Sequence, residues 1–133
     1  MAAVTVLGAG AFGTALAIVL ARSGHAVKLA VRRKSQLATL RHDRENRAYL
    51  SAVQFPSELH LAEMGIDCIR DVDAVVMAIP SGFARETLAP MASAIPRESL
   101  VISVSKGIEQ DSLRTMSQML AELAPPADRI AVL

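Results

Sequence analysis

The sequence predicts a single α/β domain, residues 1–133, built on a doubly wound, mostly parallel sheet, and three observations carry this prediction. Strand-like apolar runs alternate with helix-like segments along the whole chain. A glycine-rich turn joins the first such run to the first helix-like segment. The best central strand after the first, residues 73–80, is an apolar run closed by Pro80, as expected of a strand covered on both faces. Right-handed crossovers then favour the strand order 3-2-1-4-5-6.

The first strand and the first helix meet at a glycine motif. Gly8, Gly10 and Gly13 lie between the apolar run 3–7 and the helix-like run 14–20. In Rossmann-type folds the first glycine permits a tight turn, the second lets a pyrophosphate approach bare backbone, and the third lets helix and strand pack closely. The phosphates lie on the helix N-terminus, where free N–H groups favour negative charge. A flexible turn is the plain alternative, but the flanking elements favour nucleotide binding.

The other strands are predicted from apolar runs bounded by turn residues. Gly24 is a helix stop before the second strand. Pro56 ends an extended piece and limits it to the edge of a sheet. Residues 66–72 are a connector that returns the chain to the sheet. The extended segments expected after the first strand are residues 26–31, 53–56, 59–61, 73–80, 99–105 and 129–133.

Helical spacing of apolar residues predicts the later helices. Leu37, Leu40 and Tyr49 indicate a short surface helix followed by a loop. Residues 81–94 form a helix that is interrupted or ended near Pro90. Its inward candidates are Phe83, Leu88 and Met91.

Residues 111–123 form the last predicted helix, with Asp111 as its N-cap and Pro125-Pro126 as its end. A stripe of leucines and methionines follows its helical spacing, and we interpret this stripe as core packing rather than a ligand surface. The stripe consists of Leu113, Met116, Met119, Leu120 and Leu123.

Composition excludes several classes of function. With 52% hydrophobic residues and a formal charge of +1, the chain can bury one core and shows no sign of general nucleic-acid binding. Aromatic residues make up 3%, too few for stacking platforms on single strands. The single cysteine, Cys68, excludes an internal disulfide and suits a reducing compartment. We expect it to be a small core or near-surface residue.

Residues 2–21 carry no charge, which raises the alternative of a membrane span or a secretory signal. No Lys or Arg precedes this run, and three glycines interrupt its first half. Residues 22–29 continue as a turn and a strand, where a cleavage site or a stop-transfer flank would be expected. We therefore expect a cytoplasmic protein without a membrane partner.

Three loops are expected to converge at the carboxyl ends of the strands, where sheets of this type bind ligands. They are the glycine motif, the turn that begins at Pro80, and the turn that holds Lys106. A dinucleotide across them extends its adenosine toward the end of the second strand, where an acidic residue normally accepts the ribose hydroxyls of NAD. Arg32 and Arg33 occupy that position. Because a guanidinium pairs with a 2′-phosphate, the sequence favours NADP over NAD, with a solvated basic patch as the alternative.

Lys106 has two interpretations. A lysine after a strand is usually a surface residue, whereas at the mouth of a cleft its charge holds an anionic substrate or polarises a carbonyl group. His25, His42 and His60 show no metal-ligand spacing with one another or with Cys68. We therefore expect no metal site and interpret the histidines as structural or exposed.

Four segments resemble the N-terminal domain of the NAD(P)-dependent glycerol-3-phosphate dehydrogenases, and they are residues 8–17, 46–50, 79–81 and 106–109. The similarity covers the entire chain, and the Lys-Gly-Ile-Glu run at 106–109 is its most specific part. The resemblance implies reversible hydride transfer between a nicotinamide cofactor and dihydroxyacetone phosphate, which gives sn-glycerol 3-phosphate for membrane lipid synthesis.

Carried over residue by residue, the resemblance implies cofactor contacts at Ala11, Phe12, Arg32, Arg33, Tyr49 and Lys106, and a substrate contact at Lys106. The family often has serine and a larger aromatic residue at positions 11 and 12, and an aromatic residue where Ala30 stands. Backbone contacts survive the change at positions 11 and 12, but a serine hydroxyl contact is lost. The full predicted cofactor-binding set is Gly8, Gly10, Ala11, Phe12, Gly13, Arg32, Arg33, Tyr49, Pro80 and Lys106.

In this family the catalytic lysine and most of the substrate pocket belong to a helical C-terminal domain, which residues 1–133 do not contain. The resemblance therefore implies a cofactor-binding domain with no catalytic residue and little turnover by itself, and a homodimeric full-length protein. Two alternatives stay open: a non-catalytic NADP-binding module that signals through a partner, and a related dehydrogenase of the hydroxyacid or ketopantoate type.

Overall fold

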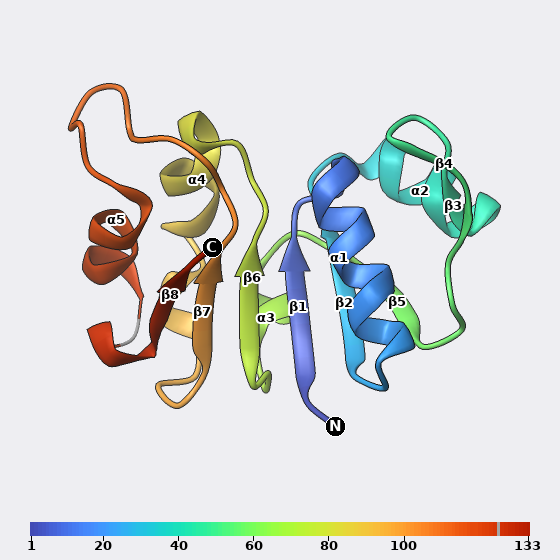
Figure 1. The fold of residues 1–133 in the computed structure, drawn as a ribbon, viewed down its shortest axis with the longest axis horizontal. Coiled ribbons are helices and arrows are strands. Elements are labelled where there is room, and N and C mark those ends of the chain that lie inside the picture. Colours follow the sequence, from blue (N-terminus) through green and yellow to red (C-terminus); the bar gives the residue numbers. More distant parts are fainter. Residues whose placement is uncertain (125) are drawn as a thin grey trace.

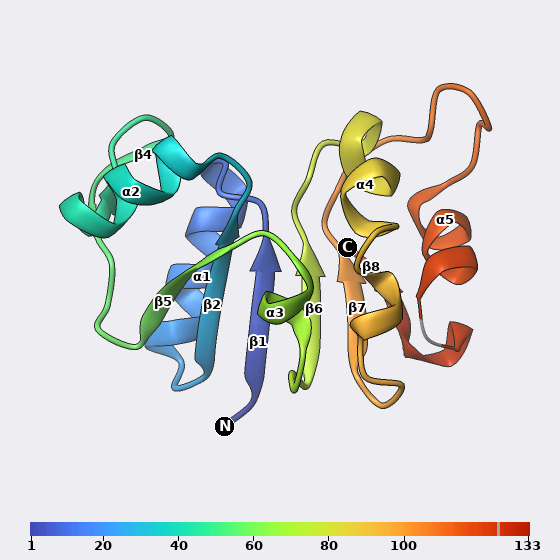
Figure 2. The same ribbon diagram turned by 180° about the vertical axis from the view of Figure 1, so that it is seen from behind.

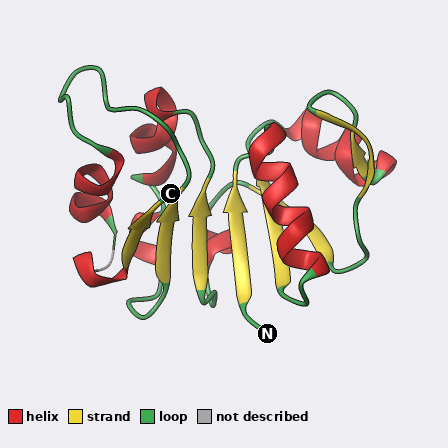
Figure 3. Ribbon diagram, in the orientation of Figure 1, coloured by secondary structure: helices red, strands yellow, loops and turns green. Residues whose placement is uncertain are grey.

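The computed structural model describes residues 1–124 and 126–133 and contains a six-stranded sheet in the order β5-β2-β1-β6-β7-β8 (Figure 1). Every neighbouring pair in this sheet is parallel, and Figure 3 shows the arrowheads at one edge. Counted along the chain within the sheet, this order is 3-2-1-4-5-6, which confirms the prediction. The strands are β1 (Ala3–Leu7), β2 (Ala26–Val31), β5 (Leu59–Glu63), β6 (Ala74–Met77), β7 (Leu100–Ser103) and β8 (Ile130–Val132).

Each face of the sheet is covered by its own helices, because successive strand residues point to opposite faces. Val4 and Val6 of β1 join the apolar cluster of α1 and α2, whereas Leu7 joins the cluster of α3, α4 and α5. Figure 1 shows α1 in front of the sheet, and Figure 2 shows α3 on the opposite face. The helices are α1 (Ala11–Arg22), α2 (Lys34–Asp43), α3 (Ile66–Ile69), α4 (Ser81–Leu88), η1 (Ala92–Ala94), α5 (Met116–Leu123) and η2 (Ala127–Arg129). The predicted connector 66–72 thus contains a one-turn helix, α3.

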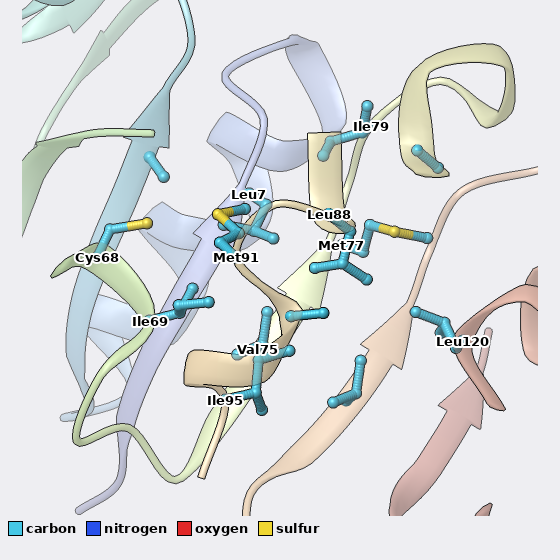
Figure 4. Close-up of a cluster of buried hydrophobic side chains, with 14 of the residues drawn as sticks. Leu7, Cys68, Ile69, Val75, Met77, Ile79, Leu88, Met91, Ile95 and Leu120 are labelled. Atoms are coloured by element: carbon cyan, nitrogen blue, oxygen red, sulfur yellow. The ribbon is translucent and has the colours of Figure 1, made fainter. Parts of the chain in front are cut away.

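The apolar core on the face of the sheet covered by α3, α4 and α5 holds α4 and α5 in place (Figure 4). Met77 of β6, Leu88 of α4 and Leu120 of α5 are fully buried in it. Burying each such side chain stabilises the fold by roughly 1.5–3 kcal/mol. This packing fixes the ends of β6 and β7, after which Pro80 and Lys106 follow in the chain.

A small hairpin lies outside the six-stranded sheet. β3 (Glu45–Asn46) and β4 (Leu50–Gln54) pair antiparallel, beside α2 in Figure 1. The predicted extended piece 53–56 thus begins within β4 and runs past its end. Tyr49 lies in the turn of this hairpin, not on the surface helix that its spacing suggested.

The last helix begins later than predicted, and Asp111 is not its N-cap. α5 begins at Met116, and the Thr115 hydroxyl accepts a hydrogen bond from the N–H of Gln118. The Gln118 side chain accepts one from the N–H of Thr115 in return. This reciprocal capping box satisfies donors that have no partner within the helix. Of the predicted end, Pro125 lies outside the described residues.

Two apolar residues expected in the core are exposed instead. Leu113 precedes α5, is 68% exposed and has a φ of 58°, so it is not part of the helical stripe. Phe83 is 49% exposed, because the buried face of α4 consists of Ala84 and Leu88. The interruption near Pro90 is confirmed, since α4 ends at Leu88 and a separate short turn, η1, follows.

Candidate functional site

A cleft of about 990 Å³ lies where the chain leaves the carboxyl ends of β1, β2, β6 and β7. Its size is at the upper end of the roughly 300–1,000 Å³ of small-molecule sites. It spans the switch point between β1 and β6, the position at which open parallel sheets bind ligands. All the predicted contacts line it, and they are Gly8, Gly10, Ala11, Phe12, Gly13, Arg32, Arg33, Tyr49, Pro80 and Lys106. The structure brings these residues together, and their binding roles stay predictions.

Two glycines of the motif are required by the backbone itself. Gly8 has a φ of 108°, and a Cβ there would lie 2.5 Å from the carbonyl oxygen of Ala78. A Cβ on Gly13 would lie 2.0 Å from the carbonyl oxygen of Gly8. Gly8 thus permits the turn and Gly13 the close approach of α1 to it.

Gly10 differs from both. Its φ of −76° suits any residue, and a Cβ there would meet no protein atom within 4 Å. Gly10 lines the cleft, so its missing side chain leaves space on the cleft wall.

The same residue marks the N-terminus of α1. Gly10 is the N-cap of α1 and supplies no side-chain cap, and the first turn holds no acidic residue. The N–H of Thr14 donates to the oxygen of Gly10 at 3.0 Å, so the N–H groups of Ala11, Phe12 and Gly13 precede the first intrahelical bond. This end of α1 has the charge and donors that bind an anion.

The basic residues that follow β2 lie at the far side of the cleft. Arg32 and Arg33 are exposed, and within residues 1–124 and 126–133 neither forms an ion pair. The guanidinium carbon of Arg32 lies 5.6 Å from the ring centroid of Phe83 on α4. This stacking holds Arg32 toward the cleft, which both residues line.

The loop that carries Lys106 is tied down on both sides. Before it, the buried Ser105 hydroxyl bonds the carbonyl oxygen of Ile79, which joins the end of β7 to that of β6. After it, Glu109 forms a bidentate pair with Arg85 of α4, at 2.8 Å for both contacts. Lys106 itself is exposed at the cleft.

The Arg85 guanidinium lowers the pKa of Glu109 from its usual 4.5 to about 2, although partial burial opposes the shift, and the Ser112 hydroxyl adds a hydrogen bond. A lowered pKa means that the ionised pair stabilises the fold above about pH 4.5 and that this stabilisation is lost as pH falls through about 2.

We expect Glu109→Gln to remove this part of the pH dependence. The stability advantage of the wild-type chain over the variant should shrink as pH falls from 5 to 2, because the Glu109 carboxylate, which the variant lacks, is protonated at a higher pH in the unfolded chain than in the folded one. Urea unfolding of both chains across this range measures the difference. An advantage that stays constant with pH would contradict the assignment.

Sequence reasoning missed several residues of the site. Among them are Phe83, Gln36, Met64 and Thr87, which line the cleft and belong to no recognisable motif. Of these, Phe83 has a signal in the sequence, because it is an aromatic residue close to Pro80. Ala84 and Leu88 form the buried face of its helix, which leaves Phe83 for the cleft.

Cys68 and the histidines are not among the residues that line the cleft. Cys68 is buried, its thiol donates to the carbonyl oxygen of Gly65 at 3.0 Å, and burial raises its pKa. His25 accepts from the N–H of Ala2 at 3.1 Å, and His42 contacts Asp43. Among the residues with described positions, no three His, Cys, Asp or Glu side chains gather as a metal site. None of the helices in that part of the chain has the length and apolar character to cross a membrane.

The sheet order and the glycine-lined cleft define an α/β domain of the Rossmann type. The sequence model of one family, described as NAD-dependent glycerol-3-phosphate dehydrogenase N-terminus, matches residues 3–133. The chain belongs to this family, which confirms the resemblance seen in the sequence.

Individual relatives agree with this assignment. A glycerol-3-phosphate dehydrogenase (NAD(P)+) of Chlorobium phaeobacteroides is 40% identical over 132 residues, which are 98% of this chain and 40% of that protein. One from Corynebacterium glutamicum is 39% identical over 135 residues, covering 100% and 40%. The crystal structure of a glycerol-3-phosphate dehydrogenase from Coxiella burnetii superposes with a TM-score of 0.87 at 26% identity, covering 98% and 40%. The chain spans about 40% of the length of the curated relatives that it matches.

Proposed function

We propose that this chain is the cofactor-binding domain of a glycerol-3-phosphate dehydrogenase and that it binds NADPH in the cleft in preference to NADH. The observation that carries the proposal is Gly10, a glycine that neither its φ nor its packing requires. It lines the cleft at the N-terminus of α1, where a diphosphate needs both bare backbone and free N–H groups. The space and the donors therefore fit the cofactor that the names of the relatives indicate.

The proposed contacts follow from the walls of the cleft. The first turn of α1 would hold the diphosphate, Pro80 and Lys106 would lie at the nicotinamide half, and Arg32 and Arg33 at the adenosine half, with Tyr49 from the hairpin. Two exposed guanidinium groups beside the ribose would form charge pairs with the 2′-phosphate of NADPH. NADH has no 2′-phosphate. This difference supports the preference for NADPH.

The substrate is proposed from the family, with Lys106 as its contact in this chain. Lys106 lies at the cleft mouth, and its ammonium group would attract the phosphate or polarise the carbonyl group of dihydroxyacetone phosphate. The bound cofactor supplies the hydride. We propose that the catalytic lysine belongs to the part of the relatives that this chain does not match, so the chain binds cofactor but does not turn over. A cytoplasmic, homodimeric full-length enzyme that binds no nucleic acid is proposed on the same resemblance.

Titration of the purified chain with NADPH and with NADH tests the proposal. We expect NADPH to bind at least about tenfold more tightly, since a charge-assisted hydrogen bond contributes roughly 1.5–3 kcal/mol. Addition of dihydroxyacetone phosphate should cause no oxidation of NADPH. Tighter binding of NADH would reject the preference for NADPH. Oxidation of NADPH that depends on the substrate would reject the proposal that the chain does not turn over. Failure to bind either cofactor would reject the proposal as a whole.

A further inference from the structure

Asn46 joins the hairpin to two other parts of the site through one buried amide. It lies on β3 and is 1% exposed, and its Nδ2 donates to the carbonyl oxygen of Ala9 at 3.0 Å and to Oγ1 of Thr14 at 2.8 Å. A carbonyl oxygen only accepts hydrogen bonds, so the contact with Ala9 establishes which end of the amide is the nitrogen. Asn46 therefore ties the hairpin to the glycine turn and to the first turn of α1.

A second amide acts on the same carbonyl group. Gln36 of α2 donates from Nε2 to the oxygen of Ala9 at 3.2 Å. The Ala9 side chain is buried in the core formed with α1 and α2. Ala9 is therefore held by its side chain and by its carbonyl group, from outside the turn.

Holding this carbonyl group also sets the direction of the next amide. The C=O and N–H of a trans peptide point in opposite directions, so the Gly10 N–H points away from Asn46. Across the described ranges, this N–H donates to no protein acceptor, and Gly10 lines the cleft. Without Asn46, the Ala9 oxygen would keep only the longer bond from Gln36, at 3.2 Å. A turn of this peptide toward the cleft would then place the partial negative charge of the oxygen against a phosphate.

We propose that Asn46 is a positioning residue for the cofactor diphosphate. It keeps the Ala9 oxygen away from the diphosphate, so that N–H groups rather than an oxygen face it. Asn46 does not itself line the cleft and acts through Ala9. This inference rests on the proposed function, because it assumes that the glycine turn binds the diphosphate.

The test compares two ligands on one variant. NADPH carries the diphosphate, whereas 2′-AMP carries the 2′-phosphate and no diphosphate. We expect Asn46→Ala to weaken NADPH binding about 10- to 100-fold, because a buried carbonyl loses a partner and the turn loses its orientation. Binding of 2′-AMP should change less than about twofold, since its proposed site at Arg32 and Arg33 does not depend on the turn. Gln54→Ala is the matched control, because it removes an amide of the same hairpin that, among the described residues, bonds Glu45 alone.

A second variant keeps the test informative if Asn46→Ala does not fold. Asn46→Asp has the same shape, but its carboxylate repels the Ala9 oxygen, whereas the protonated acid donates to it. Position 46 is 1% exposed, and burial raises the pKa of an aspartate above its ordinary value. We therefore expect the loss of NADPH affinity relative to wild type to shrink as pH falls from 8 to 5. Wild-type titrations at each pH correct for protonation of the cofactor.

The outcomes separate the inference from the proposed function. Wild-type NADPH binding with no loss in Asn46→Ala, or equal loss of NADPH and 2′-AMP, would overturn the positioning role. A pH-independent loss in Asn46→Asp would do the same. A wild-type chain that binds neither ligand would reject the proposed function, and this inference with it.

Discussion

Gly13→Ala is expected to destabilise the chain by about 3 kcal/mol or more, which is at or above the usual range for inserting a methyl group into a packed site. The new Cβ would lie 2.0 Å from the carbonyl oxygen of Gly8 and 3.1 Å from the Cβ of Ala78. The first of these atoms is backbone, so relief requires α1 to move away from β1. Alanine gains at most about 1 kcal/mol over glycine in helix propensity, which does not offset the clash. Urea unfolding of the variant and the wild type measures the loss.

Gly10→Ala is the matched control, three positions away in the same motif. Its Cβ meets nothing within 4 Å and its φ is −76°, so the stability change should stay within about 1 kcal/mol. NADPH binding should nevertheless fall at least about tenfold, because the methyl group occupies the space proposed for the diphosphate. Equal destabilisation by the two substitutions, or unchanged binding in Gly10→Ala, would contradict this division of roles.

The order of the sheet could be predicted because its information is local. β1 and β6 are apolar runs next to a turn residue, β2 is an alternating run that follows Gly24, and handedness leaves few ways to connect the three strands. The walls of the cleft follow from the same logic, since loops after parallel strands meet at one edge. For this reason the sequence alone predicts that Gly8, Pro80 and Lys106 lie together at the cleft.

Contacts between distant segments could not be predicted in this way. Asn46 lies in a polar run with no periodicity, and its partners Ala9 and Thr14 are 37 and 32 positions away. The start of α5 is a different case, because Thr115 and Gln118 have the spacing of a capping box in the sequence itself. The apolar spacing extends back to Leu113 and therefore favours Asp111 as the N-cap, because local spacing does not reveal that Leu113 has a positive φ.

Replacement of Arg32 or Arg33 by alanine is expected to weaken NADPH binding about 10- to 100-fold and NADH binding less than about threefold. The 2′-phosphate is the group that differs between the two cofactors, and a charge-assisted hydrogen bond to it contributes roughly 1.5–3 kcal/mol. Arg32 should show the larger effect, because its guanidinium is already held by the ring of Phe83, at 5.6 Å from the ring centroid. Fluorescence titration of each variant with both cofactors measures the ratio.

Arg97→Ala separates a local contact from the general effect of charge. Arg97 is exposed in the turn before β7, at the opposite edge of the sheet from the cleft, and its loss changes the net charge by the same amount. If the net charge of the whole protein governed binding, all three variants would weaken NADPH binding equally. Raised salt would then remove their difference in affinity from the wild type. A loss confined to Arg32 and Arg33, and absent with NADH, requires a guanidinium beside the 2′-phosphate. Equal losses for NADH and NADPH would instead assign both arginines to the part of the cofactor that the two share.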